Sequence, residues 1–98
     1  ADAVYDYIVD LVDATRSSEL VELGVSPRGA LALCRMAKAH AFVRGGDFVT
    51  PEDVYQVFDD VCAHRLVLSA KARLGKITAR EITEQMRQQE PVPQVAQL

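Results

Sequence analysis

The stretch that decides the fold reads Ser26-Pro27-Arg28-Gly29-Ala30. Ser26 is a favoured N-cap and Pro27 suits the first position of a helix, so a helix is predicted to begin here. Arg28 then falls in the first turn, where the positive end of the helix dipole disfavours a cation by about 0.3–1 kcal/mol. Because the same end attracts anions, two interpretations stand: a solvated surface arginine, or one that meets a phosphate or carboxylate.

The residues around Arg28 extend this pattern. Arg28 and Arg35 are seven residues apart and share a helix face, and Lys38 flanks it, so a basic strip begins at the anion-attracting end. Gly24 and Gly29 have no side chain and are expected to let a ligand approach the backbone closely. These features are compatible with both interpretations of the arginine.

Four helices are predicted, over residues 3–16, 27–44, 51–63 and 79–89. The second is rich in alanine and leucine, and the pair Gly45-Gly46 ends it. Apolar residues recur with helical spacing in the first. The third and fourth begin at threonine caps, Thr50 and Thr78, each followed by acidic residues in the first turn.

The segment between the third and fourth helices is ambiguous. Leu66-Val67-Leu68 is either extended, pairing with Phe48-Val49, or the buried tail of a helix. Residues 20–23 are too apolar for a free loop and are expected to pack on the core. The predicted fold is all-α: one small four-helix bundle over residues 1–93, compatible with one short strand pair, and a mobile tail over 94–98.

Composition narrows the classes of function. The chain has 98 residues, 49% of them hydrophobic, and a net charge of −3. The acidity argues against nucleic acid as the main partner. No apolar run reaches the ~18–20 residues that span a bilayer, and the acidic first residues are unlike a signal peptide. The absence of an initiator Met suggests an excised domain or a processed fragment.

Motifs for independent catalysis are missing. Gly75-Lys76 lacks both the preceding glycine and the following Ser or Thr of a phosphate-binding loop. A zinc site is improbable, because Cys62 and His64 point in different directions on a helix and no paired-ligand spacing occurs. Cys34 is expected to be a free thiol, as is Cys62, although a disulfide between their helices stays open.

Six stretches stand in a characteristic order. They are residues 7–16, the segment Leu23-Gly24-Val25-Ser26-Pro27-Arg28-Gly29-Ala30, then 38–45, Phe48-Val49-Thr50-Pro51-Glu52-Asp53-Val54, His64-Arg65-Leu66 and Pro91-Val92-Pro93. Together they resemble the C-terminal lid domain of MoxR-family AAA+ ATPases over nearly the whole chain. The resemblance implies the small helical fold of an AAA+ lid.

The resemblance also implies a function. Ser26, Pro27 and Arg28 correspond to the sensor 2 segment, and Arg28 would be the catalytic arginine that reaches the γ-phosphate of ATP. ATP and Mg²⁺ would be bound mainly by an AAA+ core domain of the same chain. The family implies a cytoplasmic, chaperone-like ring with neighbouring subunits, by analogy a hexamer, and partners with von Willebrand factor A domains.

Three further arginines match or neighbour these motifs, and each has a structural explanation. Arg16 complements a helix end, Arg35 is solvated, and Arg65 pairs with an aspartate of the first helix. Two other functions compete with the lid: a stand-alone helical module that binds another protein, and a helix-turn-helix reader of nucleic acid, which the acidity disfavours.

Overall fold

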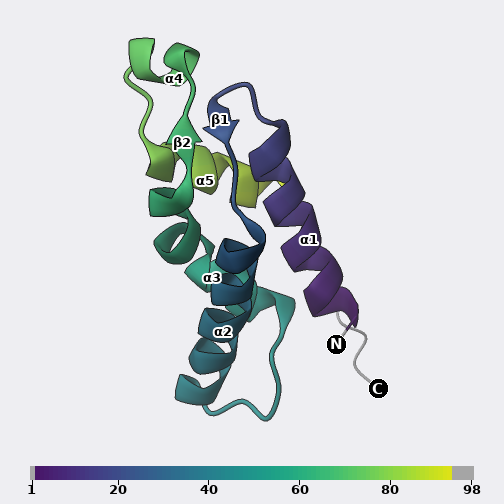
Figure 1. Ribbon diagram of the computed structural model, residues 1–98. Coiled ribbons are helices and arrows are strands. Elements are labelled where there is room, and N and C mark those ends of the chain that lie inside the picture. Colours follow the sequence, from purple (N-terminus) through teal and green to yellow (C-terminus); the bar gives the residue numbers. More distant parts are fainter. Residues whose placement is uncertain (1, 94–98) are drawn as a thin grey trace.

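The computed structural model describes residues 2–93, and it is mostly helical (Figure 1). The elements in order are α1 (Asp2–Ser17), β1 (Val21–Leu23), α2 (Pro27–Val43), α3 (Pro51–Cys62), the 3₁₀ turn η1 (Ala63–Arg65), β2 (Val67–Leu68), α4 (Ala70–Leu74) and α5 (Ala79–Gln89). The predicted all-α class with one short strand pair is confirmed. The four predicted helices agree with α1, α2, α3 and α5 to within one residue at each end, and the tail predicted over 94–98 lies outside the described residues.

Side-chain caps explain where the helices begin. Ser26, Thr50 and Thr78 each accept a hydrogen bond from an amide three residues later. At α3 and α5 the acid at that third position returns a hydrogen bond to the cap, which satisfies two unpaired amides at once. The starts predicted at these three residues are therefore confirmed.

The core lies where α1, α2, α3 and α5 meet. Its largest fully buried side chains include Tyr7, Leu11, Leu33, Phe58 and Ile82. Each such burial contributes about 1.5–3 kcal/mol. Ala37 and Ala41 are also buried, which allows α2 to approach α3 closely. Phe42, near the end of α2, is 83% exposed.

The two strands form an antiparallel pair, in which Val21 is opposite Leu68 and Leu23 is opposite Val67. Of the two alternatives for Leu66-Val67-Leu68, the extended one is confirmed for Val67–Leu68, but its expected partner Phe48-Val49 is wrong. Figure 1 shows the reason: β1 and β2 lie beside α4, whereas the loop between α2 and α3 is at the other end of the molecule. The apolar segment before Gly24, expected to pack on the core, supplies the partner strand.

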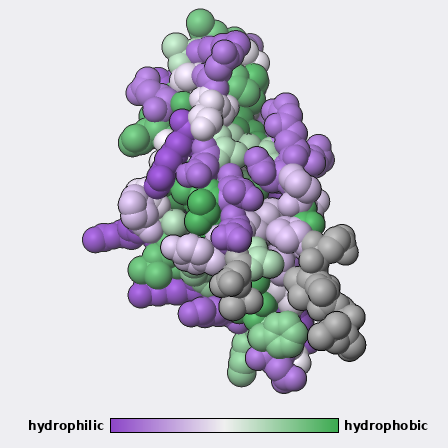
Figure 2. Space-filling model, turned by 90° about the vertical axis from the view of Figure 1, so that its right-hand side faces the viewer, coloured by the Kyte–Doolittle hydropathy of each residue, from purple (hydrophilic) through white to green (hydrophobic). Residues whose placement is uncertain are grey.

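Three aspartates of α1 are exposed, Asp6, Asp10 and Asp13. Figure 2 views the molecule from the α1 side, and hydrophilic side chains cover much of this face. No helix among residues 2–93 is long and apolar enough to cross a membrane.

Candidate functional site

Arg28 lies exposed on the first turn of α2. The Ser26 side chain accepts a hydrogen bond from the Gly29 amide at 3.1 Å, and Pro27 occupies the first helical position. Ser26 and Pro27 thus set the start of the helix and fix where Arg28 emerges. That Ser26 and Pro27 also contact a ligand stays a prediction.

The backbone just before this turn is fastened to the end of α1. The Val25 amide donates to the Thr15 hydroxyl at 3.0 Å. Arg16 Nε donates to the Val25 carbonyl at 3.1 Å. Two successive residues of α1 therefore bind both backbone groups of one residue in the loop that leads to Arg28.

Gly24 and Gly29 are close-packed by the protein itself. A Cβ atom at Gly24 would lie 2.8 Å from Thr15 Oγ1, and one at Gly29 would lie 2.7 Å from Val25 Cγ1 and 3.3 Å from Arg65 Cδ. Packing inside the domain therefore explains why both residues are glycine. The close approach of a ligand, expected from the sequence, is not needed to explain them.

Arg65 of η1 also lies close to the α2 start. Its Cδ packs near Gly29, and its Nε donates to the Val61 carbonyl at 3.0 Å. Among residues 2–93 no ion pair joins it to an aspartate of α1, contrary to the structural explanation drawn from the sequence.

Two exposed arginines, Arg16 and Arg65, thus contact the backbone around the α2 start, which itself carries the exposed Arg28. Within the part of the chain that the structure describes, none of them forms an ion pair, whereas the arginines that bind an aspartate are Arg44, Arg80 and Arg87. A guanidinium group matches the geometry of phosphate and carboxylate oxygens. The α2 start is therefore a candidate site for an anion from outside the domain.

A shallow apolar groove of about 360 Å³ leads from α1 to this surface. Its lining includes Val9, Val12, Arg16, Pro27 and Leu31. It shares Tyr5, Ile8, Leu31 and Cys34 with a second groove of about 540 Å³. A partner that covered these grooves would bring its own surface next to Arg28.

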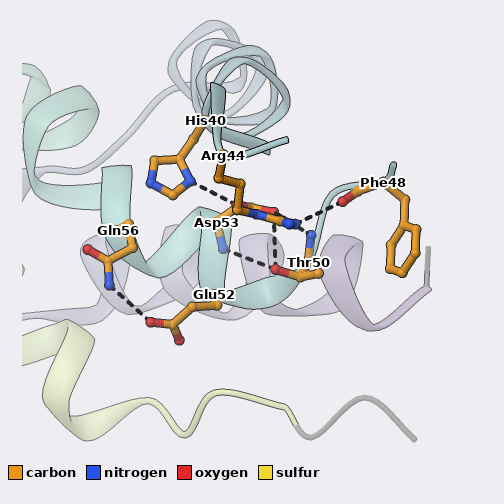
Figure 3. Close-up of polar contacts among 7 residues, drawn as sticks. All are labelled: His40, Arg44, Phe48, Thr50, Glu52, Asp53 and Gln56. Atoms are coloured by element: carbon orange, nitrogen blue, oxygen red, sulfur yellow. Dashed lines mark hydrogen bonds and ion pairs between the residues drawn. The ribbon is translucent and has the colours of Figure 1, made fainter. Parts of the chain in front are cut away.

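A second polar cluster, which no sequence motif indicated, is built around Asp53 (Figure 3). The Asp53 carboxylate, 1% exposed, accepts hydrogen bonds from Arg44 Nε at 2.6 Å and from Arg44 Nη2 at 2.7 Å. The Thr50 amide donates to it at 2.8 Å, and His40 Nδ1 lies at the same distance. A carboxylate only accepts hydrogen bonds, so Nδ1 carries the proton.

This cluster joins α2 to α3. The Arg44 guanidinium holds the pKa of the Asp53 carboxyl well below its usual range, and hydrogen bonds from Thr50 and His40 act in the same direction. Because the carboxylate is enclosed by its partners, it serves packing and is not presented to a substrate. The capping sequence Thr50-Pro51-Glu52-Asp53 was visible, but nothing in the sequence showed that Arg44 reaches it.

No three His, Cys, Asp or Glu side chains within residues 2–93 lie close enough together to hold a metal ion. Cys34 and Cys62 are both free thiols. Burial raises the pKa of the Cys62 thiol to about 12, so it is protonated near neutral pH.

Comparison with known proteins places this geometry in context. A family model described as "AAA lid domain" matches residues 13–86. Chaperone MoxR1 of Mycobacterium tuberculosis is 38% identical over 95% of the chain, and the uncharacterised protein YeaC of Bacillus subtilis is 36% identical over 94%. The chain spans 27% and 29% of these two relatives.

A solved structure gives the same picture in three dimensions. A crystal structure assigned as an ATPase from Cytophaga hutchinsonii superposes on 96% of the chain with a TM-score of 0.85 and 31% sequence identity. The chain corresponds to 31% of that protein. In these relatives, the matched region is therefore one part of a considerably longer chain.

Proposed function

We propose that this chain, which belongs to the AAA lid domain family and to its MoxR branch, brings Arg28 to ATP bound by a longer ATPase. The observation that carries the proposal is the exposed Arg28 side chain on the first turn of α2, with no ion-pair partner within residues 2–93. The N-terminus of a helix attracts anions, so a cation there is unfavourable in the isolated domain. A phosphate bound beside Arg28 would explain why an arginine occupies this position.

The chemistry asked of Arg28 is electrostatic. ATP and Mg²⁺ are held mainly by an ATPase domain outside this chain, and the guanidinium binds oxygens of the terminal phosphate as charge develops there. Arg28 is in this sense the sensor 2 arginine. Hydrolysis removes the contact, and the lid then moves relative to the ATPase domain.

The grooves between α1 and α2 support an association with that ATPase domain, because their apolar lining ends at Arg16 and Pro27, next to the arginine. By analogy with the family, the whole protein forms a cytoplasmic ring, expected to be a hexamer. The relative in Mycobacterium tuberculosis is named Chaperone MoxR1, which supports a chaperone-like role. Partners with von Willebrand factor A domains belong to the same proposal.

The test uses the longer chain that contains the ATPase domain. Arg28→Ala is expected to lower kcat about 10²-fold, the size of effect seen when one preorganised donor is removed from a reacting group. Arg35→Ala is the matched control, because it removes the same charge from an exposed position on the same helix. Assembly and nucleotide binding are measured for both variants.

Equal turnover of the Arg28→Ala variant and the unaltered chain, at equal assembly, would contradict the proposal. Arg28 would then be a solvated surface arginine, and the domain would act as a structural or protein-binding module.

A further inference from the structure

We infer that Thr15 and Arg16 are positioning residues for Arg28: they fix the loop from which α2 begins and so determine where its first turn presents the arginine. This inference rests on the proposed role of Arg28 at bound ATP. It assigns Arg16 a function other than completing the end of α1.

The first observation is that both backbone polar groups of Val25 bind to α1 and that its side chain is buried. Its amide donates to Thr15 Oγ1 at 3.0 Å, and its carbonyl accepts from Arg16 Nε at 3.1 Å. Its side chain is fully buried. The Thr15 hydroxyl in turn donates to the Val12 carbonyl at 2.6 Å, which orients its lone pairs toward Val25. One loop residue is thus fixed to α1 through its amide, its carbonyl and its side chain.

The second observation is that little freedom remains between Val25 and Arg28. Ser26 is committed to capping the Gly29 amide, and the ring of Pro27 fixes one of its two backbone dihedrals. A Cβ at Gly29 would collide with Val25 Cγ1 and approach Arg65 Cδ, so the first turn is closely packed on both residues. A displacement of Val25 therefore displaces the first turn of α2, and with it Arg28.

The third observation concerns the path of the Arg16 side chain. Its Cγ lies 2.9 Å from the position that a Cβ on Gly24 would take, so the aliphatic stem runs against the loop. A favourable charge at the end of α1 accounts for a cation there. It does not account for a stem packed on Gly24 or for a hydrogen bond to a loop nine residues away.

The consequence for catalysis follows from the precision that charge stabilisation needs. A misplacement of about 1 Å costs as much as 10²-fold in rate, even when the altered residue is far from the chemistry. Loss of the Arg16 hydrogen bond is expected to lower kcat about 10-fold with little change in KM, because the phosphate contact is weakened while the ATPase domain still binds nucleotide.

The experiment is a double-mutant cycle in the longer chain. Arg16→Met keeps an aliphatic stem and removes the donor, and Arg35→Met is the control with the same change of charge. Each is made alone and together with Arg28→Ala. If Arg16 acts through Arg28, Arg16→Met lowers kcat in the unaltered background and produces no further loss when Arg28 is already alanine.

A second pair of variants separates positioning from folding. Thr15→Val removes the acceptor for the Val25 amide at nearly constant volume, and Thr15→Ser keeps it. The Val25 amide is expected to exchange its hydrogen faster in Thr15→Val, with slow exchange retained in Thr15→Ser. The kcat of the serine variant is expected to stay within about 2-fold of the unaltered chain, against a loss of about 10-fold for valine.

Each alternative result has one meaning. Multiplicative losses for Arg16→Met and Arg28→Ala would overturn the inference, since Arg16 would then act independently. A loss with Arg28→Ala but none with Arg16→Met would overturn the inference and leave the proposed function standing. Unaltered turnover with Arg28→Ala would overturn both.

Discussion

Asp53 carries its charge in an almost fully buried position, and its partners determine whether that charge stabilises the fold. Hydrogen bonds from Arg44, Thr50 and His40 lower the pKa of the Asp53 carboxyl in the folded chain, with Arg44 as the largest cause. A carboxylate with a lowered folded pKa stabilises the protein above its unfolded pKa of about 3.9. That contribution is lost as the pH falls from there toward the folded pKa.

Asp53→Asn is therefore expected to lower the free energy of unfolding at pH 7 by about 1–3 kcal/mol, the range for hydrogen bonds to charged groups. The difference between variant and unaltered chain should shrink as the pH falls below 4. Urea unfolding of the 98-residue chain at pH 7 and at pH 3 measures both values. Asp10→Asn, on the exposed face of α1, is the control and should change stability little at either pH. A difference that stayed constant between the two pH values would contradict the assignment.

At the scale of single elements, α2 shows how close packing outweighs helix propensity. Replacing Gly29 by alanine favours a helix by about 1 kcal/mol in an unconstrained position. Here the new Cβ would lie 2.7 Å from Cγ1 of the buried Val25, and overpacking of this kind costs about 1–3 kcal/mol. Gly29→Ala is expected to lower the melting temperature of the 98-residue chain.

Gly75→Ala provides the comparison for that variant. Its Cβ would meet no atom closer than 3.4 Å, and the residue has an ordinary helical conformation. The melting temperatures of the two variants should therefore differ. Gly75→Ala is expected to melt at the same temperature as the unaltered chain or slightly above it. An equal or raised melting temperature for Gly29→Ala would show that the Val25 side chain can move aside.

The elements also show what the sequence could and could not predict. Local chemistry determined the helix starts, since Ser26, Thr50 and Thr78 act through amides three residues away. The partner of Leu66-Val67-Leu68 was not predictable, because a strand of two or three residues has no periodicity that selects Val21 over Phe48. The same limit applies to the site. Arg28 was predicted as a site residue from its local motif and stays a prediction, whereas the contacts of Arg16, Arg65 and Asp53 depend on the tertiary fold.

At the scale of the whole molecule, the domain is elongated, with principal extents of 48 × 21 × 20 Å. The strand pair and α4 lie at one end and the loop between α2 and α3 at the other (Figure 1). Arg28 follows soon after β1, and the groove of about 360 Å³ along α1 reaches its neighbour Pro27 and Arg16. The surface that we propose for an anion is thus at one edge of the grooves and not inside a cavity of the domain.

That position predicts the behaviour of the 98-residue chain alone. A solvated guanidinium contributes only about 0–1 kcal/mol to an exposed ion pair, and the sequence has no phosphate-binding loop. The chain alone is therefore expected to fold, to hydrolyse no ATP and to show no rise in melting temperature with millimolar Mg-ATP. Inorganic triphosphate is the control for general binding of anions.

The longer chain that contains the ATPase domain should hydrolyse ATP, and its melting temperature should rise with Mg-ATP. Steady ATP hydrolysis by the pure 98-residue chain would contradict the lid function as proposed, because this chain would then contain a catalytic centre of its own. A rise in melting temperature with Mg-ATP but not with triphosphate would instead indicate a nucleoside site within the domain. A lid requires that the 98-residue chain shows neither ATP turnover nor stabilisation by Mg-ATP and that the longer chain shows both, because the arginine of a lid meets a phosphate that another domain binds.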